Sequence, residues 1–196
     1  MPRPDLFYAY IGQDQLVNTR KNESASYSRV LELARAAGDQ QAITELTTLG
    51  PPPWSSLSKW HVFRKWKLAY QAKIATAPPA PEAISPEYAS PQEQAQYAAA
   101  DDFSFEHFVG STMSGPLEAV DLPALGTGFA IPIFIIQGQE DLTTVPELAK
   151  AYFDSIKAPR KQFYLVPGPG HEGSATGRDL TLKVLTEQVR TLALDR

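Results

Sequence analysis

Two residues near the end of the chain, Asp141 and His171, have side chains that could act together on a proton. Asp141 closes a segment that begins with a continuous apolar run at residues 131–136, and His171 follows the glycine-rich residues 167–170. An imidazole can remove the proton of a serine hydroxyl, and a carboxylate can hold that imidazole in one tautomer. We therefore expect Asp141 to be the acid and His171 the general base of a Ser-His-Asp triad.

The serine that such a triad needs is missing from the pattern. The G-x-S-x-G turn that presents a nucleophilic serine does not occur anywhere in the 196 residues. The nearest string, at residues 110–115, has the wrong spacing and no apolar strand before it. We expect the nucleophile to lie outside this chain, and we expect the isolated chain to be inactive because the backbone donors of an oxyanion hole would be missing as well.

Composition excludes several other kinds of site. A chain of 196 residues with 43% hydrophobic and 20% charged residues can bury a sizeable core. Its net charge of −4 provides no basic field for nucleic acid or an anionic membrane. Zero cysteines exclude disulfides, cysteine-based zinc sites and a thiol nucleophile. We expect no metal and no cofactor, and a cytoplasmic location, because the first apolar run is too short for a signal peptide or a membrane span.

Alternating strands and helices should position the two residues. The apolar run at 131–137 is typical of a parallel strand covered on both faces. Thr144 with Glu147 resembles a capping box and predicts a helix to about residue 156. A second strand is expected at 163–166, and parallel strands bind their ligands beyond their carboxyl ends, where both loops would meet. The closing helix would turn one apolar face inward, formed by Leu182, Leu185, Val189 and Leu192.

The segment before residue 125 reads mainly as helices. Residues 6–11 are rich in aromatic and branched side chains and predict a strand. Helices are expected at 24–37 and 39–49, and the stripe of Trp60, Phe63, Trp66, Tyr70 and Ile74 predicts a third. Residues 75–91 are rich in proline and predict an extended connection. Ser90 should cap a helix at 91–101, and the three phenylalanines 103, 105 and 108 predict a buried, less regular segment.

Taken together, these segments resemble the α/β-hydrolase family, in particular its proline-iminopeptidase-like branch. The resemblance is carried by residues 4–13, by the helical insertion, by residues 132–141 with the acid at their end, and by residues 168–171 with the histidine. It implies a partial α/β-hydrolase fold of about three parallel strands with flanking helices and an inserted helical cap. The core would comprise residues 1–16 and 125–196, and the cap residues 17–124.

One departure from that family concerns the substrate. Proline iminopeptidases have a glutamate after a tryptophan of the cap that holds the free amino group, whereas here Trp66 is followed by Lys67. A cation at that place would repel an ammonium group. Unless a cap carboxylate such as Glu32 or Glu45 substitutes, an ester or another neutral acyl substrate is expected in place of an amino-terminal peptide.

Three interpretations of the chain follow. It could be the C-terminal part of a serine hydrolase that cleaves ester or peptide bonds once an N-terminal half is supplied, including the case of a gene begun at an internal methionine. It could be a non-catalytic remnant or binding module of the same fold. It could also be a small α/β protein without this chemistry. The first interpretation implies an N-terminal half, or self-association through the open edge of the strand at residues 6–11, as partner, and an acyl substrate.

Overall fold

A computed structural model of the chain describes residues 3–76, 85–171 and 174–194. Its centre is a parallel sheet with the strand order β1-β2-β3, in which β1 is Tyr10–Gln13, β2 is Ile133–Gly138 and β3 is Lys161–Val166. Every residue of β2 is buried, as expected for a continuous apolar strand between two partners. The three predicted parallel strands are confirmed, and their carboxyl ends point to the same edge of the sheet.

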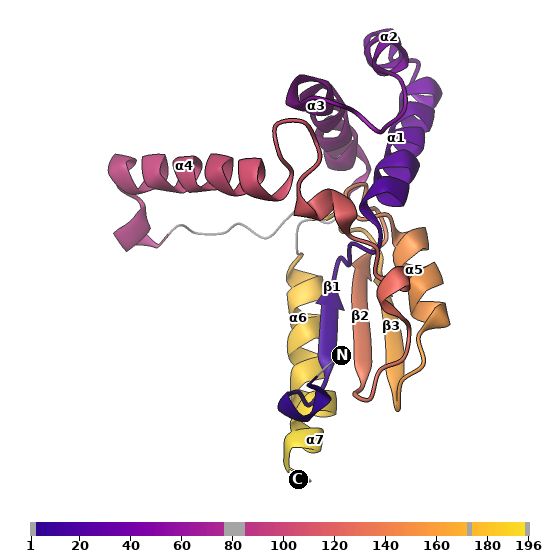
Figure 1. Cartoon of the computed structure of the whole chain (residues 1–196), viewed down its shortest axis with the longest axis vertical. Coiled ribbons are helices and arrows are strands. Elements are labelled where there is room, and N and C mark those ends of the chain that lie inside the picture. The colour runs from indigo at the N-terminus through magenta and orange to yellow at the C-terminus, as the bar shows by residue number, and fades with distance from the viewer. Residues whose placement is uncertain (1–2, 77–84, 172–173, 195–196) are drawn as a thin grey trace.

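Helices cover both faces of the sheet (Figure 1). On one face, α5 (Pro146–Ser155) packs Tyr152 and Phe153 against Ile133 and Ile135. On the other face, α6 (Ala175–Val184) packs Val184 against Phe134 and Ile136 of the alternate positions of β2. α6 continues through a π-helical turn at Leu185–Val189 into α7 (Arg190–Leu194). The alternation of side chains along β2 therefore supplies two separate apolar cores.

Three further helices form a third core above the carboxyl ends of the strands (Figure 1). They are α1 (Thr19–Ala36), α2 (Gln40–Leu49) and α3 (Leu57–Ile74). Each begins at a residue whose side chain accepts a hydrogen bond from the first turn, and the three caps are Asn18, Asp39 and Ser56. Their shared core contains Tyr27, Leu46, Trp54, Phe63, Trp66 and Tyr70.

The remaining elements of the described residues are one long helix and four short 3-10 turns. α4 (Pro91–Phe108) begins at the predicted cap Ser90 and extends away from the other helices (Figure 1). The 3-10 turns are Pro4–Leu6, Pro86–Tyr88, Pro116–Ala119 and Pro123–Leu125. In the described part of the chain, no helix is long and apolar enough to cross a membrane. The predicted boundaries of core and cap, at residues 16/17 and 124/125, stay predictions.

The first strand begins later than predicted. Residues 4–6 form a 3-10 turn, and the strand starts only at Tyr10. The reason is its partner: the ladder with β2 runs from Tyr10 opposite Ile133 to Gln13 opposite Ile136. Aromatic and branched residues favour a strand locally, but a strand forms only where a neighbour supplies hydrogen bonds.

Two predictions about apolar faces are wrong. Residues 103–108 belong to α4 and are not an irregular segment, and the side chains of Phe103 and Phe108 are 61% and 60% exposed. In the closing helix, Leu182 is 60% exposed while Val184 is buried. The face of α6 that packs on the sheet carries Leu180 and Val184 instead, and the π-helical turn that follows brings Val189, five residues after Val184, to the same core. The connection predicted at residues 75–91 lies partly outside the described residues.

Candidate active site

The loop after β2 fixes Asp141 by hydrogen bonds to both carboxylate oxygens. Oδ1 accepts from the backbone N–H groups of Thr143 and Thr144, at 2.7 and 2.9 Å. Oδ2 accepts from Thr144 Oγ1 at 2.6 Å and from Gln137 Nε2 at 3.1 Å. The side chain of Asp141 is fully buried. Four donors, all from residues within four positions of Asp141, therefore hold this carboxylate in one orientation.

Helices α1 and α3 hold the same loop from above. Asn22 on α1 donates from Nδ2 to the Thr143 carbonyl at 2.6 Å and accepts at Oδ1 from the Val145 N–H at 2.8 Å. Gln71 on α3 donates from Nε2 to the Glu140 carbonyl at 2.5 Å and accepts at Oε1 from the Leu142 N–H at 2.7 Å. The helical layer thus positions the loop that carries Asp141.

A close approach of two loops brings His171 to Asp141. The Glu140 N–H donates to the Pro169 carbonyl at 3.1 Å. Gly138 permits this contact, because a Cβ placed there would lie 2.5 Å from the Gly170 carbonyl oxygen and 2.7 Å from that of Pro169. Gly168 has a φ of 97°, a conformation that favours glycine. The glycines therefore allow two backbones to meet where any larger side chain would keep them apart.

The two residues predicted to act together are in direct contact. Nδ1 of His171 lies 3.0 Å from Oδ2 of Asp141. A carboxylate can only accept, so Nδ1 carries the hydrogen in this contact. Thr144 Oγ1, which donates to Asp141, also lies 3.2 Å from Nδ1. Among the residues that the structure describes, none hydrogen-bonds to Nε2 of His171, and 38% of the histidine side chain is exposed. Nε2 is therefore free to take a proton.

The surroundings of His171 favour its charged form. Burial alone lowers the pKa of this imidazole, but the hydrogen bond to Asp141 and the charges of Asp141 and Asp14 outweigh it, so the pKa is raised above its ordinary value. Lys67 opposes this increase. An imidazole that becomes more basic beside a fixed carboxylate suits a general base.

Asp14 is a site residue that the sequence analysis missed. It directly follows β1, has a φ of 46°, and accepts at Oδ1 from the Gly138 N–H at 2.9 Å and from Gln137 Nε2 at 3.3 Å. Burial raises the pKa of Asp14 to about 6, with a contribution from the charge of Asp141. Its position at the carboxyl end of a parallel strand is the signal that could have identified it.

A ligand atom of each of Asp14, Asp141 and His171 lies within 4.8 Å of the others, so these three residues could approach a cation together. The nitrogen that faces the carboxylates, Nδ1 of His171, already donates its hydrogen to Asp141. Asp14 likewise receives two N–H groups at one oxygen. This bonding suits the transfer and stabilisation of a proton.

The predicted capping role of Thr144 is wrong. α5 begins after Val145 without a side-chain cap and has Pro146 in its first turn, where a proline needs no partner for its nitrogen. The Thr144 hydroxyl is therefore directed to Asp141 and His171. The other two histidines have local contacts: His107 Nδ1 bonds the Phe103 carbonyl at 2.8 Å, and His61 packs against Trp60.

Comparisons with known proteins identify the fold to which this arrangement of strands and helices belongs. No family model matches the chain. A Bacillus subtilis (strain 168) protein named "Probable aminopeptidase YbaC" is 22% identical over 196 aligned residues, which cover 96% of this chain and 59% of that protein. The crystal structure of a proline iminopeptidase from Mycobacterium smegmatis is 17% identical with a TM-score of 0.57, over 99% of this chain and 60% of the other. The chain has part of an α/β-hydrolase fold.

The α/β-hydrolase fold confirms the predicted fold class, and the resemblance to proline iminopeptidases is confirmed at the level of the fold. A thermophilic esterase from Thermogutta terrifontis is also similar, at 17% identity and a TM-score of 0.39, over 96% of this chain and 58% of that one. The chain spans about 60% of the length of the relatives that it matches. Asp141 and His171 lie together at the carboxyl ends of the strands of this fold, and their catalytic roles remain predictions.

Proposed function

We propose that this chain supplies the acid and the general base of a serine hydrolase that cleaves ester bonds. The observation that carries the proposal is the 3.0 Å contact between Nδ1 of His171 and Oδ2 of Asp141, which leaves Nε2 without a partner among the described residues. A carboxylate that is already saturated with donors can orient the imidazole without leaving its place. The structural likeness to α/β-hydrolases supports the proposal.

In the proposed reaction, Nε2 of His171 takes the proton of a serine hydroxyl as the serine oxygen forms a bond to the substrate carbonyl carbon. The resulting imidazolium donates that proton to the leaving oxygen as the ester bond breaks. Water then attacks the acyl-enzyme, with His171 again taking and returning a proton. Asp141 stabilises the imidazolium throughout. Because no G-x-S-x-G occurs in the chain, we propose that the serine comes from residues outside it.

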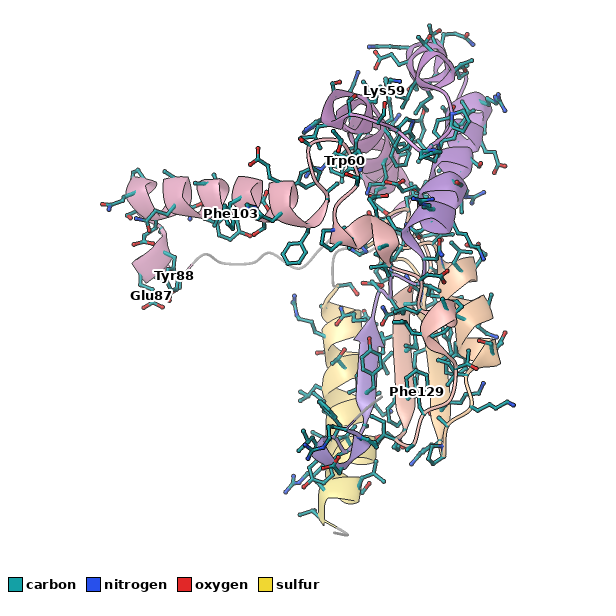
Figure 2. All side chains as sticks on the ribbon, viewed as in Figure 1. Lys59, Trp60, Glu87, Tyr88, Phe103 and Phe129 are labelled. Carbon is teal, nitrogen blue, oxygen red and sulfur yellow. The ribbon has the colours of Figure 1, made fainter. Side chains whose placement is uncertain are left out.

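The partner that we propose is an N-terminal hydrolase half, or a second copy, that pairs with β1. Among the described strands, β1 pairs only with β2, so one of its edges has no strand beside it. A groove of about 460 Å³ lies on the α5 side of the sheet over β1 and β2, and is lined by apolar side chains that include Tyr10, Leu122, Phe129 and Ile135. Figure 2 shows Phe129 beside the strands. An open edge with an apolar groove is suited to strand addition.

Hydrolysis of p-nitrophenyl acetate tests the proposal. The assay compares the chain alone with the chain joined to the segment that its gene encodes upstream of Met1. We expect activity only in the joined protein, and we expect His171→Ala to lower kcat/KM by at least about 10³-fold. His107→Ala is the matched control, because His107 is exposed and its Nδ1 bonds the Phe103 carbonyl of the same helix.

Two results would overturn the proposal. The first is activity that His171→Ala leaves unchanged, which would remove His171 from the mechanism. The second is an upstream region without an apolar strand and a G-x-S-x-G motif, which would favour the alternative of a non-catalytic remnant or binding module.

A further inference from the structure

We propose that Lys67 binds a carboxylate group of the substrate, so that the natural acyl substrate is an anion. This inference rests on the proposed function, because it places the acyl substrate at the Asp141–His171 pair. It goes beyond the family resemblance, which only argued against an ammonium group at this position.

The face of α3 on which the Lys67 side chain lies follows from the position of Gln71. Residues four apart lie on the same face of a helix, so Lys67 and Gln71 share one face of α3. Gln71 contacts the loop of Asp141 through Glu140 and Leu142, and its side chain also fills the space where a Cβ on Gly170 would lie. Lys67 therefore lies on the same face of α3 as Gln71, one helical turn farther from the sheet. This face is directed toward the loops that carry Asp141 and His171.

The charges of these groups act on each other, as this placement requires. The charge of Asp141 and that of Glu23, which lies on the neighbouring helix α1, stabilise the charged form of Lys67. The charge of Arg64 opposes it. Lys67 in turn disfavours the charged form of His171. These mutual effects agree with the helix geometry, which places Lys67 on the side of α3 that carries Gln71 and faces the loop of Asp141.

Lys67 is the half-buried cation of α3 for which the described residues supply no ion pair, whereas Lys59 and Arg64, which also have none there, are exposed. Lys65 pairs with Glu45 at 2.8 Å and Lys73 pairs with Asp39 at 3.8 Å. Within residues 3–76, 85–171 and 174–194, no ion pair includes Lys67, and its Nζ lies 6.0 Å from the centre of the Phe63 ring. Burial lowers the pKa of Lys67 to about 8, so the ammonium is still mainly charged at pH 7. A half-buried cation without a partner favours an incoming anion.

The carboxylates of the helical layer do not reverse this preference. Burial raises the pKa of Glu23 to about 7, so this group is only partly charged at neutral pH. Glu45 accepts from Trp66 Nε1 and from Lys65 Nζ, both at 2.8 Å, and Glu32 lies 3.8 Å from Arg29. The two carboxylates that could have replaced the missing glutamate are therefore engaged with other groups.

Binding of small probes to the 196-residue chain tests the inference without turnover. The probes are hexanoate, hexylammonium and hexan-1-ol, which share one apolar chain and differ in charge. The readout is the imidazole NMR signal of His171, assigned among the three histidines with His171→Ala. We expect hexanoate to shift this signal and to bind more tightly than the other two probes.

Three variants identify the group that binds. Lys67→Met should weaken hexanoate binding at least tenfold, and Lys67→Arg should keep it within about threefold because the positive charge remains. Lys59→Met is the matched control, since it removes the same charge from an exposed residue at the end of α3 far from the sheet (Figure 2). Equal hexanoate affinity in Lys67→Met, no response of His171 to hexanoate, or tighter binding of hexylammonium would each overturn the inference.

These outcomes are separate from those of the proposed function. Hexanoate binding that depends on Lys67, in a joined protein without esterase activity, would refute the hydrolase and leave an anion site. Esterase activity that depends on His171, with hexanoate binding unchanged in Lys67→Met, would refute only the role of Lys67.

Discussion

Replacement of Asp141 by asparagine is the perturbation whose effect the structure defines best. Oδ2 of Asp141 accepts from three side-chain donors, Thr144 Oγ1, Gln137 Nε2 and His171 Nδ1. In Asp141→Asn an amide N–H₂ would take the place of Oδ2 or of Oδ1, and donors would face donors. The substitution keeps the volume of the side chain, so the effect measures hydrogen bonding and charge.

The size of the expected loss in unfolding free energy follows from the hydrogen bonds of Asp141 that cannot be rearranged in Asp141→Asn. The Thr144 hydroxyl can turn and accept from the new amide, and Gln137 Nε2 keeps the Thr144 carbonyl at 3.0 Å. His171 loses a charged acceptor outright. Hydrogen bonds to charged groups contribute about 1.5–3 kcal/mol each, and a buried donor without a partner costs about 1–3 kcal/mol. We expect Asp141→Asn to lower the free energy of unfolding by about 3 kcal/mol.

Urea unfolding at pH 7, followed by circular dichroism, measures this loss. Asp154→Asn is the control, because its ion pair with Lys150 is exposed and such pairs contribute only about 0–1 kcal/mol. The pKa of His171, measured by NMR in the same variant, should fall toward its ordinary value. A loss in Asp141→Asn no larger than that in Asp154→Asn would refute the account of the Asp141 hydrogen-bond network.

Three further predictions follow from the same site. The pKa of His171 is raised in the folded state, so its contribution to stability should be complete below pH 6.5 and should disappear as the pH rises through the folded pKa. Urea unfolding of the wild type and of His171→Ala at several pH values measures this contribution. Asp14→Asn should raise the free energy of unfolding at pH 7 by about 1–2 kcal/mol, because the folded pKa of about 6 lies above the ordinary value of 3.8 and the carboxylate is partly screened by solvent. Unchanged stability in Asp14→Asn would contradict the burial of this charge. Gly138→Ala should separate the two loops and abolish the raised pKa of His171, whereas Gly128→Ala, where a Cβ meets nothing within 4 Å, should leave that pKa unchanged.

The meeting of Asp141 and His171 could be predicted because it depends on strong local signals. A continuous apolar run indicates a buried strand, and the carboxyl ends of parallel strands converge. Glycines before His171 indicate a close backbone approach, which Gly138 and Gly170 confirm in the contact between the loops.

The misassigned features depend on partners that are distant in the chain. Thr144 fits a capping pattern, but its hydroxyl bonds a histidine 27 residues away. The start of β1 is set by its register with β2, more than 120 residues later. Asp14 follows a strand of only four residues and becomes part of the site through Gly138 and Gln137. Local patterns carry no information about such contacts.

The tautomer and the pKa of His171 test the central claim most directly. An NMR titration that correlates the ring protons with both ring nitrogens shows which nitrogen carries the hydrogen. We predict a neutral imidazole protonated at Nδ1, a raised pKa, and loss of both properties in Asp141→Asn. A ring protonated at Nε2, or a pKa that Asp141→Asn leaves unchanged, would contradict this claim.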